Sequence, residues 1–185
     1  MILEERAYIK MKFSKRMDLF GESIFTTLAN MRSERKKQGL EVIDLSIGAP
    51  NIPPTQEVME TIAKEAMKPE NYLYAIQDAV DLQNTVKEWY ERRYGVVIDP
   101  TTELTSLLGS QDGLAHLALT LVDEGDTVLV QDPCYPIFRD GPLLAGAKVV
   151  TMPLLKENDY LIDFDMIDEK TAQDAKYMIV SYPNN

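Results

Sequence analysis

Short apolar runs alternate with helical periodicity in the second half of the chain. Four runs of β-forming and apolar residues stand out: Leu104–Leu108, Thr127–Gln131, Lys148–Met152 and Tyr177–Ser181. Between the first two, apolar residues recur at helical spacing at Leu114, Leu117, Ala118 and Leu121. Strands that alternate with helices are typical of a mostly parallel sheet covered on both faces. The pattern therefore predicts an α/β fold.

The first half of the chain is predicted to be mainly helical. Helical spacing of Ile24, Leu28, Met31 and Arg35 predicts a helix within 21–37, and residues 42–47 form a short strand-like run. A second helix should start at Pro53-Pro54-Thr55, with Val58, Ile62, Ala63 and Ala66 on one face. A third should carry Leu82, Val86, Trp89 and Tyr90 and end at Gly95.

The segment 105–124 has the order expected of a phosphate site. A strand-like run meets Gly109, Ser110 and Gln111, and an apolar helix follows. We expect Ser110 to cap this helix and Gly125 to end it. The N–H groups of Ser110, Gln111 and Asp112 would then converge on an anion. Most turns of this kind bind nothing, so the motif alone leaves a purely structural role open.

Two later segments bring complementary side chains to the same edge of the predicted sheet. Tyr135 lies in the turn Asp132-Pro133-Cys134-Tyr135-Pro136 after one strand, and Ser181-Tyr182-Pro183-Asn184-Asn185 follows another. Open α/β sheets bind ligands at the carboxyl ends of their strands. An anion cradle, an aromatic platform and an amide donor together indicate a site for a phosphorylated aromatic ring.

Composition narrows the classes of partner. The chain of 185 residues has 30 acidic and 19 basic residues and a net charge of −11, which argues against nucleic acid or an anionic membrane as partner. The single cysteine, Cys134, fits a reducing compartment. No signal-peptide core or long apolar run is present, so we expect a soluble cytoplasmic protein. We expect no metal site, and His116 is interpreted as a packing residue.

At these motifs the chain resembles the class I and II aminotransferases, pyridoxal-phosphate enzymes of fold type I, and most of all their diaminopimelate-aminotransferase-like group. The resemblance runs from about Ser14 to Asn185. It rests on six ordered segments: 44–54, Tyr74 within 71–76, the helix end 89–95, 109–113, 132–136 and 182–185. It implies part of the large domain, a mostly parallel sheet flanked by helices, with an N-terminal small-domain segment. We expect residues 1–50 to form an arm and small-domain segment and 51–185 an incomplete cofactor-binding large domain.

The resemblance assigns a role to each candidate site residue. Ser110 and Gln111 would contact the phosphate of pyridoxal 5'-phosphate, Tyr135 would stack on its ring, and Asn185 would donate to its phenolic oxygen. Tyr74 would reach the cofactor phosphate of a neighbouring subunit, which implies a homodimer; an interface aromatic is the alternative. Gly48 would meet the substrate carboxylate, with a plain turn glycine as the alternative.

By the same resemblance, the lysine that forms the Schiff base, the Asp at the pyridine nitrogen and the Arg that clamps the substrate carboxylate lie beyond Asn185. No lysine in this chain fits the catalytic role. We therefore expect an amino-terminal, truncated portion of an enzyme that transfers an amino group from an amino acid to a 2-oxo acid, inactive alone. In the family's sheet the strand at 104–108 pairs with strands that come later. We expect an unpaired strand edge here, covered by domain swapping or oligomerisation.

Two other functions stay open from the sequence. One is a non-catalytic binding or dimerisation module. The other is a nucleotide-dependent oxidoreductase, which the sequence disfavours because no G-x-G-x-x-G follows the first predicted strand.

Overall fold

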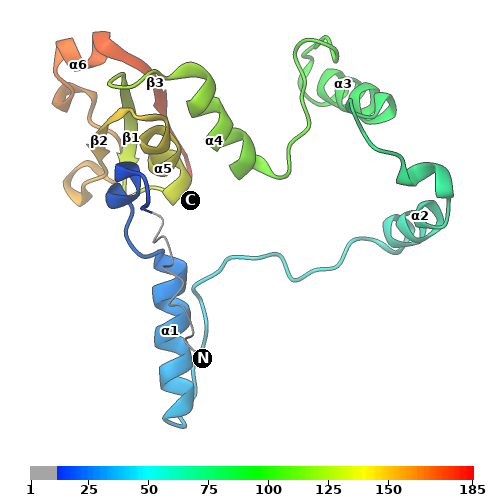
Figure 1. Cartoon of the computed structure of the whole chain (residues 1–185), viewed down its shortest axis with the longest axis horizontal. Helices are drawn as coiled ribbons and strands as arrows, with labels where there is room; N and C mark the ends of the chain where they lie inside the picture. The colour runs from blue at the N-terminus through cyan, green and yellow to red at the C-terminus, as the bar shows by residue number, and fades with distance from the viewer. Residues whose placement is uncertain (1–11) are drawn as a thin grey trace, which may run out of the picture. The chain divides into compact units, whose positions relative to one another are not determined.

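A three-stranded parallel sheet, in the order β2-β1-β3, organises the C-terminal half of the chain (Figure 1). Its strands are β1 (Thr127–Asp132), β2 (Lys148–Pro153) and β3 (Ala175–Ile179). In this computed structural model, residues 12–185 are described. They divide into two units, one of residues 12–21 and 107–185 and one of residues 22–106. The parallel sheet confirms the predicted fold class.

Both faces of the central strand β1 are buried. Val128 and Val130 pack on one side with Val122 and Ala147, while Leu129 packs on the other with Met152, Leu154 and Ile162. The first face is covered by helix α5 (Pro136–Ala145), whose Phe138 and Ala145 join that cluster. The opposite face is covered by the chain that follows β2. A strand buried on both faces reads as a continuous apolar run, which is why the sequence pattern identified it.

Two helices pack closely beside the sheet. Helix α4 (Ser110–Leu121) lies against α5, and a methyl group at Gly141 would come within 3.3 Å of the Leu114 carbonyl oxygen. Gly141 therefore allows the two backbones to approach. The remaining elements of this unit are η1 (Lys15–Leu19), η3 (Lys156–Asn158), η4 (Phe164–Met166) and α6 (Glu169–Asp174).

The unit of residues 22–106 is made of helices joined by extended chain. They are α1 (Ile24–Lys37), α2 (Gln56–Ala66), η2 (Pro69–Tyr72) and α3 (Val80–Tyr94). Gly95 ends α3 in the left-handed conformation, at φ 67°, as predicted. No residue of this unit is buried.

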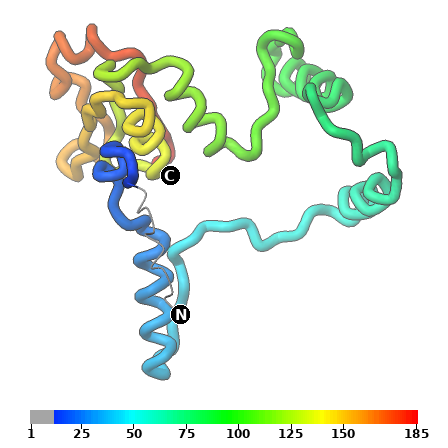
Figure 2. Tube along the Cα trace, in the orientation of Figure 1, coloured from blue at the N-terminus to red at the C-terminus, as the bar shows by residue number. Residues whose placement is uncertain are grey.

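Two predicted strands are wrong. Residues 104–108 and 42–47 form no strand and run as irregular chain (Figures 1 and 2). A strand needs a neighbour for its backbone hydrogen bonds, and the only ladders among residues 12–185 that include named strands join β1 to β2 and β3. Leu108 is 97% exposed. The outer edge of β3 has no neighbouring strand in the described chain. Its coverage by a second copy of the chain stays a prediction.

Helix α4 also begins and ends differently from the prediction. Its N-cap is Gly109, at φ 90°, and Ser110 is its first residue. A residue at this positive φ is preferably glycine, so Gly109 takes the N-cap position and Ser110 becomes the first residue of the helix. The helix stops at Leu121, and Gly125 belongs to the turn before β1. Strand β3 starts two residues earlier than predicted, at Ala175.

The domain boundary predicted at residue 50 stays a prediction.

Among residues 12–185, no helix has the length and apolarity required to cross a bilayer.

We predict that Gly141→Val lowers the free energy of unfolding by about 1–3 kcal/mol, because the added atoms meet the backbone of α4. Denaturant unfolding measures this. Gly113→Val is the matched control, since a side chain there meets only the end of Leu107. Equal losses for both variants would contradict the prediction.

Candidate functional site

Three segments that the sequence predicts to form a site meet at the carboxyl edge of the sheet. The Tyr135 hydroxyl, after β1, donates to Gln111 Oε1 in the first turn of α4 at 3.0 Å. Asn184 Nδ2, after β3, donates to the carbonyl of Pro133 at 2.9 Å. The turn after β1 is therefore hydrogen-bonded both to the first turn of α4 and to the segment after β3.

The start of α4 presents two backbone donors. No described residue accepts a hydrogen bond from the N–H groups of Ser110 or Gln111. The third expected donor is not free, because the Asp112 N–H donates to the Gly109 carbonyl at 3.2 Å. This tight first turn corrects the prediction of three convergent N–H groups. Two unpaired N–H groups at the N-terminus of a 12-residue helix still favour an anion.

The Asp112 carboxylate is held beside this cradle. Its Oδ2 accepts the N–H of Leu108 at 3.2 Å, and its Oδ1 lies 2.8 Å from His116 Nδ1. Asp112 thus stabilises the first turn of α4, as expected. The interpretation of His116 as a packing residue is wrong, since its side chain is 70% exposed and lies one helical turn from Asp112.

Tyr135 is half-buried at the start of α5. Its ring meets Phe138 edge-on, with centroids 6.0 Å apart, while its hydroxyl reaches Gln111. These contacts fix the ring at the sheet edge.

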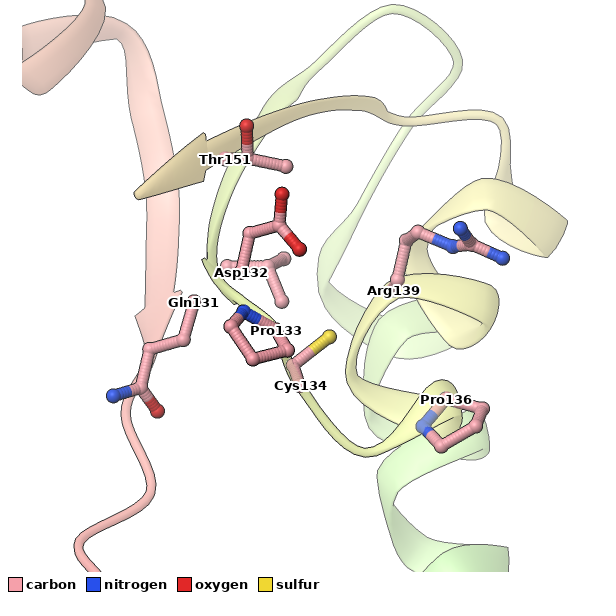
Figure 3. Close-up of a pocket in the computed structure, with 8 residues that line it drawn as sticks. Gln131, Asp132, Pro133, Cys134, Pro136, Arg139 and Thr151 are labelled. Carbon is pink, nitrogen blue, oxygen red and sulfur yellow. The ribbon is translucent and has the colours of Figure 1, made fainter. Parts of the chain in front are cut away.

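A cavity of about 250 Å³ lies next to this turn (Figure 3). It is lined by Val130, Gln131, Asp132, Pro133, Cys134, Pro136, Arg139 and Thr151, none of them a predicted site residue. Burial raises the pKa of the Cys134 thiol above its ordinary value, so the group is a neutral thiol at physiological pH.

The segment before Asn185 is tied down by side chains. Gln131 Oε1 accepts the N–H of Ser181, and the Tyr182 hydroxyl accepts the N–H of Ile162 at 2.9 Å. Asn185 follows directly and is exposed. Sequence reasoning missed Gln131; its only signal was an amide at the end of an apolar strand.

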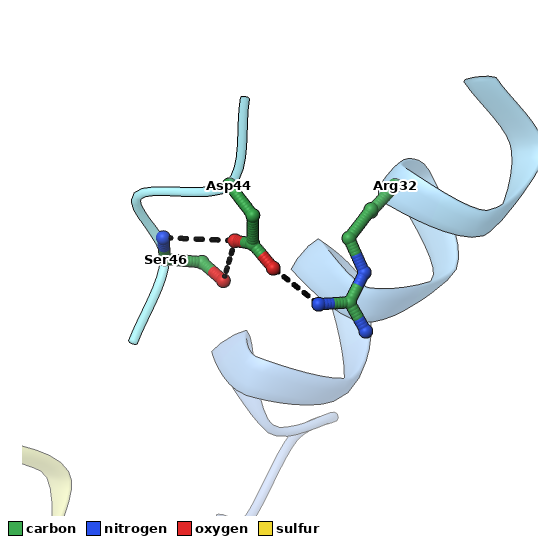
Figure 4. Close-up of polar contacts among 3 residues, drawn as sticks. All are labelled: Arg32, Asp44 and Ser46. Atoms are coloured by element: carbon green, nitrogen blue, oxygen red, sulfur yellow. Dashed lines mark hydrogen bonds and ion pairs between the residues drawn. The ribbon is translucent and has the colours of Figure 1, made fainter. Parts of the chain in front are cut away.

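Gly48 and Tyr74 belong to the unit of residues 22–106. Gly48 follows a turn in which Asp44 Oδ1 accepts the N–H of Ser46 at 3.0 Å and its hydroxyl at 2.6 Å, while Arg32 pairs with Oδ2 (Figure 4). The bonds from Ser46, followed by that from Arg32, lower the pKa of Asp44 from 3.8 to about 2. Tyr74 is 91% exposed.

The fold and this edge define a class of protein: a parallel α/β domain with an anion cradle and an aromatic platform at the carboxyl ends of its strands. The donor set fits pyridoxal 5'-phosphate, because Gly109 leaves open space at the cradle and Tyr135 lies within one hydrogen bond of it. In residues 12–185 no cluster of three or more potential metal ligands occurs.

The family model of aminotransferase class I and II matches residues 41–185. The chain belongs to this family, whose members use pyridoxal 5'-phosphate.

Similar proteins include the LL-diaminopimelate aminotransferases of Aquifex aeolicus and Dehalococcoides mccartyi (strain 195). The first is 39% identical over 94% of this chain and 45% of the relative. The second is 38% identical over 95% of this chain and 45% of the relative. This chain therefore spans under half the length of these relatives.

Solved structures are similar as well. Substrate-bound BacF from Bacillus subtilis is 31% identical, with a TM-score of 0.83 over 95% of this chain and 45% of that one. A probable N-succinyldiaminopimelate aminotransferase from Thermus thermophilus is 32% identical, with a TM-score of 0.80 over 88% of this chain and 44% of that one.

We predict that the Asp44 carboxyl titrates near pH 2, and that Ser46→Ala raises this pKa more than Arg32→Gln does. Because the folded pKa lies below the ordinary value of 3.8, the turn stabilises the fold above about pH 4, and this contribution is lost as pH falls toward 2. Carbon-13 NMR of the carboxyl group measures the titration. An unshifted midpoint in the wild-type chain would contradict the prediction.

Proposed function

We propose that this chain supplies the phosphate and ring contacts of the pyridoxal-phosphate site of an aminotransferase that moves an amino group from an amino acid to a 2-oxo acid. The observation that carries the proposal is the hydrogen bond between Tyr135 and Gln111, which joins the aromatic platform to the anion cradle. Family membership and the names of the relatives support the reaction class.

Each residue has a distinct task in the proposed site. Ser110 and Gln111 bind the phosphate through their N–H groups, with charge stabilisation of up to about 2 kcal/mol when partly buried. Tyr135 stacks on the ring and fixes its plane. Asn185 donates to the phenolic oxygen. When bound, the cofactor supplies an electron-withdrawing ring that stabilises charge at the substrate carbon.

Two further assignments concern residues 22–106. We propose that Gly48 meets the substrate carboxylate, which is supported by its open backbone beside the Asp44 turn. We propose that Tyr74 reaches the cofactor phosphate of a second subunit in a homodimer. Its 91% exposure and the lack of buried residues in this unit support an interface role. A cytoplasmic location is proposed from the single free cysteine.

The cradle is tested by pyridoxal-phosphate and inorganic-phosphate titrations, followed through the NMR shifts of the Ser110 and Gln111 amides. We predict that Gly109→Ala weakens binding of both ligands by up to about thirtyfold, because a side chain at φ 90° distorts the cap. Gly125→Ala is the matched control: it has the same φ of 90° and equally open surroundings, but lies before β1. Equal weakening by both variants, or no amide shift in the wild type, would contradict the proposed phosphate contacts of Ser110 and Gln111.

The platform predicts a ligand-specific loss. Tyr135→Ala should weaken pyridoxal-phosphate binding by about two- to tenfold and leave inorganic phosphate unchanged, since only the former has a ring to stack. Tyr135→Phe keeps the ring and should keep most of the affinity. Isothermal titration of the three proteins checks this. Parallel losses for both ligands would show that Tyr135 acts only through Gln111.

A further inference from the structure

Gln131 is a buried polar residue at the junction of two site segments. It is 1% exposed, lies on the face of β1 that carries Leu129, and pairs in register with Met152 of β2. An amide in such surroundings is unfavourable unless its hydrogen bonds are made. Its Oε1 accepts the N–H of Ser181, whereas its Nε2 has no partner among the described residues.

The bond to Ser181 lies where the backbone ladder ends. Pairing of β1 with β3 stops at Val130 and Ile179. Pairing of β1 with β2 continues to Asp132, whose backbone carbonyl accepts the N–H of Leu154 at 2.8 Å. After β3 the chain leaves the sheet. Figure 3 shows the amide of Gln131 turned away from Cys134 and Arg139 and beside β3. Its Oε1 accepts the N–H of Ser181, two residues after the pairing with β3 ends.

The same stretch of β1 leads directly into the aromatic turn. Two residues after Gln131, the Pro133 carbonyl accepts Asn184 Nδ2 at 2.9 Å. Residues 131–133 are therefore linked twice to residues 181–184, once through a buried side chain and once through an exposed one. Tyr135 and Asn185 each lie within two residues of these links.

We propose that Gln131 is a positioning residue that holds the Ser181–Asn185 segment at a fixed distance from the Tyr135 turn. The inference rests on the proposed function for its effect on the cofactor, because Asn185 is the residue whose amide it would align. The unpaired Nε2 offsets part of what the Ser181 bond contributes to stability. Removing the whole amide should therefore loosen the segment more than it destabilises the fold.

The test compares this chain with Gln131→Met, which keeps the volume and removes the amide, and Gln131→Asn, which is polar but one carbon too short. Leu129→Met is the control, a volume-conserving change on the same face. Amide exchange at Ser181 should rise by about tenfold or more in both Gln131 variants, relative to the amides of β1, and stay unchanged in Leu129→Met. The midpoint of thermal unfolding should shift little in Gln131→Met.

Ligand binding gives a second measurement. Pyridoxal phosphate should bind Gln131→Met about five- to tenfold more weakly, with inorganic phosphate unaffected, because Asn185 is proposed to donate to the phenolic oxygen of the ring and not to the phosphate. Unchanged exchange at Ser181, or a uniform rise at all amides with a matching loss of stability, would overturn the positioning role. If Gln131→Met does not fold, amide exchange at Ser181 in the wild-type chain still tests the proposal. An amide there that is not protected from exchange would contradict it.

The two proposals fail separately. Absence of pyridoxal-phosphate binding by the wild-type chain counts against the proposed function. Exchange at Ser181 needs no ligand, so it tests Gln131 in either case.

Discussion

The structure depends on the pairing of β1 with a parallel neighbour on each side. This pairing buries both faces of one strand, Val128 and Val130 on one and Leu129 on the other, and so builds the core. Parallel strands also point their carboxyl ends the same way. The turn after β1 and the segment after β3 are thereby delivered to a single edge. The part of the candidate site formed by these two segments is therefore a geometric consequence of the core.

At that edge, side chains replace the backbone ladder. The Ser181 N–H goes to Gln131, the Ile162 N–H goes to Tyr182, and Asn184 reaches Pro133. Each such bond has a net value of about 0.5–1.5 kcal/mol, so the segment after β3 is held by a few modest interactions. Helix α4 is brought in by a different route, the close packing on Gly141 and the bond from Tyr135 to Gln111. Backbone packing sets where the segments lie, and polar side chains set their final separation.

The sequence predicted the elements whose causes are local. β1 and β2 are short apolar runs, and Gly95 ends α3 because only a left-handed residue fits there. It failed for residues 104–108 and 42–47, because a strand exists only with a partner and propensity says nothing about pairing. The three site motifs were found from their order along the chain. Three features could not be found from the sequence, because each depends on backbone geometry that the residue type does not determine. They are the hydrogen bond of the Asp112 N–H within the first turn of α4, the exposed pairing of His116 with Asp112, and the buried bond of Gln131.

The candidate site residues differ in what supports them. Ser110, Gln111, Tyr135 and Asn185 belong to the unit that contains the buried clusters, so the proposed cofactor contacts rest on a core. Gly48 and Tyr74 belong to a unit with no buried residue, where α2 leaves Val58, Met59 and Ile62 about half exposed. Helices of 11 to 15 residues are marginal in water unless an apolar face is covered. The contacts to the cofactor are therefore the more stable part of the proposed site. The proposed contacts of Gly48 with the substrate carboxylate and of Tyr74 with a second subunit would need the apolar faces of these helices to be covered.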